Sequence, residues 1–204
     1  MKKALLIVSV AVFGLSFGCG NPSVSTFTDT RDGKVYRIVE INGQVWMAEN
    51  LNYAAEGSMC YGNKNALCAK YGRIYNWDAA LKACPAGFHL PDNEEWDTLV
   101  NYAGGEETAG KKLKARSGWN SFRGESGNGT DIYGFSALSG CDSLYFRNLC
   151  GSVHWWSATE YDADFVWYWY MTHNYEGVGR DNYGASKTTP FFSVRCVADK
   201  EGEQ

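Results

Sequence analysis

Two segments decide the fold of this chain: Cys84-Pro-Ala-Gly-Phe-His-Leu-Pro-Asp-Asn-Glu-Glu-Trp96 and Phe192-Ser-Val-Arg-Cys-Val197. The first predicts a turn and then the start of a helix, because Asp92 and Glu95 have the spacing of a capping pair. The second predicts a closing strand within residues 191–198. Each segment carries one cysteine, and Trp155-Trp-Ser-Ala-Thr159 lies between them.

The order and spacing of these motifs resemble the Fibrobacter succinogenes major paralogous domain, a variant of the C-type-lectin-like fold. The Leu-Pro-x-x-x-Glu-Trp and Val-Arg-Cys patterns are also similar to formylglycine-generating, sulfatase-modifying enzymes and to the variable receptors of diversity-generating retroelements. The resemblance covers residues 27–199, with residues 200–204 as a tail. It implies one loop-rich α+β domain with two short helices, small antiparallel sheets and disulfide staples.

The first 18 residues predict a secretion signal, because two lysines precede an uncharged run over residues 4–17 that is too short to span a membrane. Gly18-Cys19 indicates a lipoprotein cleavage site, with Cys19 lipidated and residues 19–26 forming a polar tether. Ser16 stands where a leucine is expected, so ordinary secretion is the alternative. We expect a cell-envelope protein held by a lipid anchor, at the outer membrane or cell surface.

The charge and composition limit the partners. The formal net charge is -4, and removal of Lys2 and Lys3 with the signal makes it -6, which disfavours nucleic acid and any membrane contact other than the lipid anchor. With four prolines and no repeats, the remaining chain predicts a single domain.

The cysteines predict disulfides, since an exported chain with an even set usually pairs them. If Cys19 carries the lipid, six of the seven cysteines remain, and they allow fifteen pairings. Spacing favours two short bridges and leaves one long bridge, which the lectin-like fold also implies. The expected pairs are Cys60 with Cys68, Cys141 with Cys150, and Cys84 with Cys196.

Turn signals and apolar spacing predict the elements. Asp32-Gly33 and Asn42-Gly43 separate residues 27–30, 34–41 and 44–47, so the domain opens as an antiparallel meander. Helices are expected over residues 75–83 and after Asp92, where Trp96, Leu99, Val100 and Ala103 have helical spacing, with a further short helix possible over 108–115. Trp96 is interpreted as a core residue.

We expect no catalysis and no cofactor. The three histidines, His89, His154 and His173, are isolated in sequence, and the chain carries no phosphate-binding or dinucleotide motif. Formylglycine-generating enzymes use a pair of free cysteines near the C-terminus, whereas Cys196 is the only cysteine after Cys150.

Calcium-dependent sugar binding is not expected either, because the Glu-Pro-Asn, Gln-Pro-Asp and Trp-Asn-Asp tripeptides of calcium lectins do not occur. Asn128 and Asp131 are weak candidates for a structural calcium site, since their oxygens suit that ion. The simpler interpretation is that Asn128-Gly129 forms a turn.

Aromatic density over residues 145–183 is the main indication of binding. Residues 165–171 predict a strand in which Trp167 and Trp169 share one face and Tyr168 and Tyr170 the other. If the tryptophan face packs in the core, the tyrosine face lies near water, where the hydroxyl groups can find hydrogen-bond partners.

The loop that follows combines tyrosines, amides, charges and glycines, as binding loops do. Retroelement receptors carry their variable ligand-facing residues here, and the resemblance places the site in the same region. Of the adjacent tryptophans, Trp156 is assigned to the core by family pattern. The expected ligand-binding residues are Trp155, Tyr168, Tyr170, His173, Asn174, Tyr175, Arg180, Asp181, Asn182 and Tyr183.

These features predict a lipoprotein that binds an extracellular ligand, a glycan or a protein, without catalysis. Stacked aromatic rings beside amides and carboxylates suit the faces and hydroxyls of a pyranose. The alternatives are that the aromatic residues fill a loop-rich core of a structural envelope protein or, on the resemblance alone, that the chain is a sulfatase-modifying type of enzyme.

Overall fold

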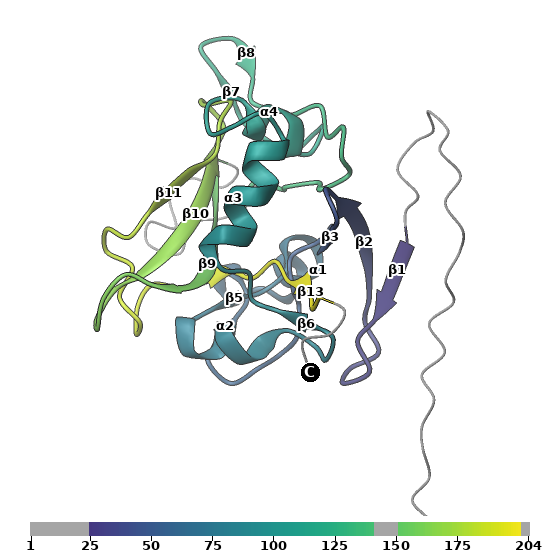
Figure 1. Ribbon diagram of the computed structural model, residues 1–204, viewed down its shortest axis with the longest axis vertical. Coiled ribbons are helices and arrows are strands. Elements are labelled where there is room, and N and C mark those ends of the chain that lie inside the picture. The colour runs from purple at the N-terminus through teal and green to yellow at the C-terminus, as the bar shows by residue number, and fades with distance from the viewer. Residues whose placement is uncertain (1–24, 141–150, 201–204) are drawn as a thin grey trace, which may run out of the picture.

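The computed structural model describes residues 25–140 and 151–200. This part of the chain is an α+β domain of short helices and small sheets, as predicted (Figure 1). The predicted signal segment over residues 1–18, Cys19, Cys141 and Cys150 lie outside the described residues. The architecture is compatible with a C-type-lectin-like fold.

The first sheet contains the predicted meander. Asn42 and Gly43 have φ angles of 51° and 75°, the left-handed conformation that a two-residue hairpin turn needs. The opening antiparallel meander is therefore confirmed. In the order β1-β2-β3-β13-β6, the strands are Ser25–Thr28, Val35–Ile41, Gln44–Met47, Val197–Ala198 and Phe88–His89.

The second sheet holds the aromatic strands. Its pairings are antiparallel except that β12 runs parallel to β9. In the order β11-β10-β9-β12-β5-β4, its strands are Gly179–Asp181, Val166–Thr172, Ser152–Glu160, Phe192–Ser193, Ile74–Tyr75 and Ser58–Met59. A separate small hairpin joins β7 (Ser121–Phe122) to β8 (Glu125–Ser126).

The closing segment forms two short strands instead of the one strand predicted. Strand β12 belongs to the second sheet and β13 to the first, so the residues between them cross from one sheet to the other. The carbonyl oxygens of Val194 and Cys196 accept hydrogen bonds from the backbone nitrogens of Leu51 and Met47, at 2.9 and 3.0 Å. The closing segment is divided into two strands because the residues between them bond to Met47 and Leu51 and do not continue the β12 pairing.

The helices are α1 (Asn65–Tyr71), α2 (Trp77–Ala83), α3 (Asn93–Tyr102) and α4 (Ala109–Leu113). The predicted capping pair is confirmed, since Asp92 Oδ1 accepts from the backbone of Glu95 and Glu95 Oε2 accepts from the backbone of Asp92. The expected count of two helices was too low. Helix α1 was missed because no side chain caps its first turn. None of the described helices is long and apolar enough to cross a membrane.

Two apolar clusters lie on opposite sides of β9. The first surrounds Trp96, whose ring centroid is 4.9 Å from that of Trp46, 5.7 Å from Trp155 and 5.9 Å from Trp169. Trp156 enters the second cluster, against α2 and the closing segment. The assignments of Trp96 and Trp156 to the core are confirmed.

Two predicted disulfides are present. Cys60 is bonded to Cys68, and Cys84 is bonded to Cys196 across a sequence separation of 112 residues. The long bridge ties the end of α2 to the closing segment, so it joins the two motifs from which the fold was predicted.

Candidate functional site

Strand β10 carries two of the predicted site residues, Tyr168 and Tyr170. Trp167, Trp169 and Met171 alternate with Tyr168 and Tyr170 along the strand, so the two sets face opposite sides. Trp169 and Met171 are fully buried in the first cluster, beneath α3. The tyrosines face the side of the second cluster, against which Tyr168 packs.

The tyrosine face is half-buried packing surface. The Tyr168 ring centroid lies 4.9 Å from that of Phe192 and 5.6 Å from that of His154. Tyr170 lies 5.9 Å from His154, and its ring covers Gly179, where a Cβ atom would overlap it. Tyr168 and Tyr170 are therefore partly used in packing against neighbouring core residues, and neither ring is a free binding surface.

Trp155 is a core residue and is excluded from a surface site. It has no exposed area, and its Nε1 donates to Asn50 Oδ1 at 2.9 Å. The prediction assumed that only one of two adjacent tryptophans would face inward. Both do, because β9 lies inside its sheet with an apolar cluster on each face, which buries Trp156 equally.

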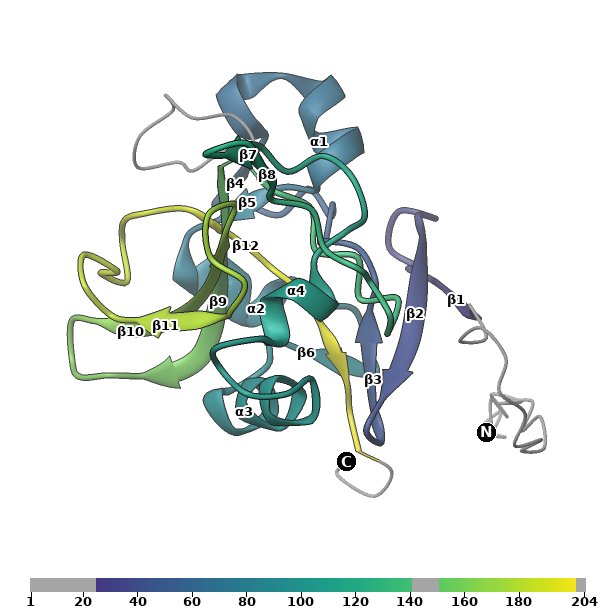
Figure 2. The ribbon, with the colours of Figure 1, turned by 90° about the horizontal axis from the view of Figure 1, so that it is seen from above.

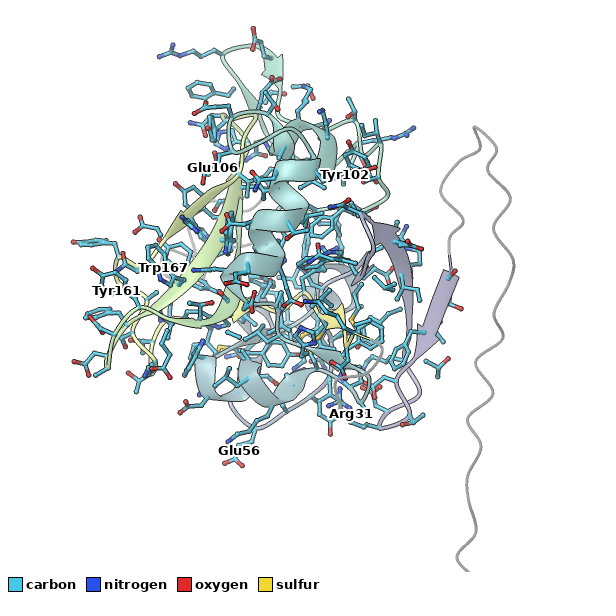
Figure 3. All side chains as sticks on the ribbon, viewed as in Figure 1. Arg31, Glu56, Tyr102, Glu106, Tyr161 and Trp167 are labelled. Carbon is cyan, nitrogen blue, oxygen red and sulfur yellow. A yellow bond between two sulfur atoms is a disulfide. The ribbon has the colours of Figure 1, made fainter. Side chains whose placement is uncertain are left out.

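A more exposed aromatic surface lies at the end of the β9–β10 hairpin, which projects away from α3 (Figure 1). We call Tyr161, Phe165, Trp167 and Arg180 the hairpin-tip surface. Tyr161 is 54% exposed and Phe165 is 37% exposed. The rings of Tyr161 and Trp167 meet at 84° with centroids 5.3 Å apart (Figure 3).

Arg180 braces this surface from β11. Its Cζ atom lies 5.6 Å from the ring centroids of both Trp167 and Trp169, and its Nη1 donates to Asp97 Oδ2 in α3 at 3.1 Å. Trp167 was missed as a surface residue because the whole tryptophan face was assigned to core. The polar turn over residues 161–164 was the available signal, since it marks the end of the hairpin.

His173, Asn174 and Tyr175 lie elsewhere, around a pocket of only about 60 Å³ beside α4 and the β7–β8 hairpin. His173 Nδ1 donates to the carbonyl oxygen of Gly151 at 2.9 Å. The Tyr175 hydroxyl donates to Glu107 Oε2 at 3.0 Å. The pocket is too small for a sugar ring.

Lys114 lies against the same pocket as a buried cation. Its Nζ donates to the carbonyl oxygens of Thr172 and Tyr175 and lies 4.9 Å from the Trp119 ring centroid. Burial lowers the pKa of Lys114 to about 8. These contacts tie α4 to the loop after β10, which is a structural role.

Asp181, Asn182 and Tyr183 form the turn after β11. Asp181 Oδ1 accepts from the backbone nitrogens of Asn182 and Tyr183, at 2.7 and 2.9 Å, and Tyr183 is 85% exposed. The predicted site residues are thus divided among the core, the tyrosine face of β10, strand β11, the small pocket and this turn. They do not form one surface.

A larger cleft is lined by residues at the start of β2 and at the end of α1. Figure 2 shows where these two elements lie in the domain. The volume of the cleft is about 310 Å³, and the charged residues that line its mouth include Lys34, Arg37, Glu49 and Lys70. Sequence reasoning missed it because these charges are scattered along the chain and form no motif.

Arg195 lies at the inner end of this cleft and is 1% exposed. Its Nε and Nη2 donate to Asn50 Oδ1, and its Nη1 donates to the carbonyl oxygens of Met47 and Phe135. Among the described residues, no carboxylate accepts a hydrogen bond from it. Burial lowers the pKa of Arg195 to about 9, so the guanidinium is still charged at neutral pH.

The two calcium candidates bond within their own loop. Asn128 Oδ1 accepts from the backbone of Trp119 at 3.0 Å, and both Asp131 oxygens accept from Ser136 at 2.7 Å. Across residues 25–140 and 151–200, no group of three or more His, Cys, Asp or Glu side chains could hold a metal ion.

His89 and Cys196 are also engaged in structure. The His89 Nε2 and Nδ1 atoms lie 2.9 and 2.7 Å from Glu95 Oε1 and Asp199 Oδ1. The hydrogen bond to Glu95, helped by that to Asp199, raises the pKa of His89 to about 9, so both nitrogens donate at neutral pH. Cys196 is bonded to Cys84 and offers no free thiol.

The comparisons with known proteins agree with the motifs. No curated protein and no solved structure matches the chain. A family model, the Fibrobacter succinogenes major domain, matches residues 39–198, from within β2 to the last residue of β13. That match covers most of the chain, which therefore belongs to the Fibrobacter succinogenes major domain family.

Proposed function

We propose that this chain is a non-catalytic, lipid-anchored protein of the cell envelope that binds an extracellular glycan through the hairpin-tip surface. The observation that carries the proposal is the perpendicular pair formed by Tyr161 and Trp167. The exposed ring of Tyr161 and the half-buried ring of Trp167 form an apolar corner, and one ring can stack on the face of a pyranose while the other supports its edge.

Polar groups accompany the rings. Arg180 and Asp97 form an ion pair in which both side chains are about 40% exposed, at 39% and 40%. Their remaining donors and acceptors suit sugar hydroxyls. Because Arg180 also contacts the buried Trp169 ring, the corner is held before a ligand arrives, which lowers the entropy lost on binding.

We propose that the protein is not a catalyst, because His89 and Cys196 are already engaged in structural interactions. His89 is protonated between two carboxylates at neutral pH, so it is not placed as a general base. The disulfide of Cys196 withholds the thiol that a formylglycine-generating enzyme would need.

A glycan array probed with the mature domain, followed by calorimetric titration of the best ligand, tests the binding proposal. Tyr161→Ala and Trp167→Ala should each weaken binding by about 1–3 kcal/mol. Phe122→Ala is the matched control, because Phe122 is 40% exposed but lies on the β7–β8 hairpin. Unchanged affinity in both tip variants, or an array without a glycan ligand, would count against the proposal.

Membrane fractionation tests the lipid anchor. Cys19→Ser should release the protein from the membrane fraction and abolish fatty-acid labelling, because it removes the thiol that carries the lipid. Absence of labelling in the parent protein would exclude the anchor.

A further inference from the structure

We infer that the cleft between β2 and α1 is a second ligand site, which binds the carboxylate of a small acidic sugar such as a uronic acid. The cleft shares no residue with the hairpin-tip surface. Its volume of about 310 Å³ is within the usual range of small-molecule sites and suits a ligand of monosaccharide or disaccharide size.

Arg37 supplies the group that would recognise the carboxylate. Its Nε and backbone nitrogen donate to the two oxygens of Glu49, at 3.0 and 3.1 Å, which fixes the direction of the guanidinium. Its Nη1 and Nη2 atoms donate to no residue that the structure describes, and the side chain is 46% exposed. Two parallel N–H groups in this arrangement match a carboxylate in geometry and charge.

The surroundings favour an anion. Lys70 adds positive charge, and Lys34 adds a cation whose Nζ is paired with Asp32 Oδ2 at 2.6 Å. Glu49 is the one acid among the described residues that line the cleft. Arg195 lies behind the wall as a buried cation bonded to uncharged acceptors only. Its field is weakly screened inside the protein, so it adds to a positive potential in a chain whose net charge is -4.

The walls of the cleft are held in place. The Cys60–Cys68 disulfide staples α1, whose last turn forms one wall. Gly72, at φ 77°, then passes so close to Asn50 that a Cβ atom would lie 2.7 Å from the Asn50 Cβ. A site that exists before binding loses less entropy when it closes on a ligand.

The strand pairing argues for a compact ligand over an extended peptide. The start of β2 pairs with β1 over Val35–Ile38, and β3 pairs with β2 only from Ile38 onward. On the β3 side, the Arg37 carbonyl oxygen accepts from the backbone nitrogen of Ala48 and the Arg37 backbone nitrogen donates to Glu49 Oε2, so an extended peptide finds no continuous strand edge in this wall to pair with. Recognition depends on side chains, which suits a small molecule with one carboxylate and several hydroxyls.

An NMR titration of the ¹⁵N-labelled mature domain tests the site, with a galacturonate disaccharide and a neutral galactose disaccharide as probes. The acidic probe alone should shift the amides of residues 34–37 and 69–72, and added salt should weaken its binding. Equal shifts from the neutral probe, shifts confined to β9–β11, or tighter binding of an acidic dipeptide would each overturn the assignment.

Three variants sharpen this test. Arg37→Gln should lower the affinity for the galacturonate probe by at least about tenfold, because it removes a charged pair of hydrogen bonds. Glu49→Gln should raise the affinity, a change that loss of folding cannot imitate. Lys187→Gln removes a cation paired with Glu160, outside the cleft, and should change nothing. If Arg37→Gln does not fold, Lys70→Gln takes its place, and unchanged affinity in the folded variant would overturn the proposal.

Discussion

Asn50 holds the buried guanidinium of Arg195 with a single neutral oxygen. Its Oδ1 accepts from Arg195 Nε at 3.0 Å, from Arg195 Nη2 at 2.8 Å and from Trp155 Nε1 at 2.9 Å. Its Nδ2 donates to the carbonyl oxygen of Tyr71 at 3.0 Å. One amide thus connects the closing segment, β9 and the end of α1, where a carboxylate would be the usual partner of a buried arginine.

Asn50→Ala should therefore destabilise the domain strongly, by about 3–5 kcal/mol, because it leaves a buried cation short of its main acceptor. The free energy of unfolding in urea measures the effect. Asn52→Ala is the control, since the Asn52 side chain makes no hydrogen bond within the described residues, and it should cost roughly 1 kcal/mol or less. Similar losses in the two variants would show that Asn50 has no special role.

Stability should fall as the pH rises from about 6.5 to 8. The pKa of His89 is raised from 6.5 to about 9, mainly by Glu95, so over this interval the folded state binds more protons than the unfolded state. Lys114 acts in the opposite direction above pH 8, because burial lowers its pKa from 10.5 to about 8. Urea unfolding at several pH values should show the decline in the parent and a flatter dependence in His89→Gln. Equal slopes would contradict the assignment.

Loss of the long disulfide should cost more than loss of the short one. The double variant Cys84→Ala, Cys196→Ala opens a loop with a sequence separation of 112, against 8 for Cys60→Ala, Cys68→Ala. The chain-entropy model gives about 2–5 kcal/mol for such bridges, with the long one roughly 2 kcal/mol above the short one. Thermal melts compare the two variants. A smaller loss for the long bridge would mean that strain, and not loop entropy, dominates.

Trp167 and Trp169 should separate binding from stability. They lie two residues apart on one face of β10, yet Trp169 is fully buried and its Nε1 donates to Asn93 Oδ1 at 3.0 Å. Trp169→Ala should cost about 3–5 kcal/mol of stability. Trp167→Ala should cost roughly 1 kcal/mol, with the larger effect on glycan affinity. If both variants melt alike, Trp167 belongs to the core and the hairpin-tip surface is not a binding face.

Local patterns were sufficient for much of the fold. The Asn42-Gly43 turn, the capping pair at Asp92 and the helical spacing around Trp96 act over a few residues, so they can be recognised without a structure. The cysteine spacing and the family motifs together predicted the bond between Cys84 and Cys196. These features also located the core tryptophan and the division into strands at the start of the domain.

The binding surfaces needed the tertiary structure. Trp155 and Trp167 both lie in strands with alternating side chains, but the burial of each depends on what covers it. Trp155 is buried because β9 is packed on both faces. Trp167 is less buried because the β9–β10 hairpin extends beyond α3. Likewise, Arg37 and Arg195 are distant in sequence, and only the crossing of the closing segment between two sheets brings them to the same cleft. The sequence by itself determined the periodicity and the turns, because these are local, and the cysteine spacing with the family motifs was enough to predict the two bridges of the described residues. Only the tertiary structure decided which side chains are exposed and which distant side chains meet at one surface, because both depend on long-range packing that no single segment encodes.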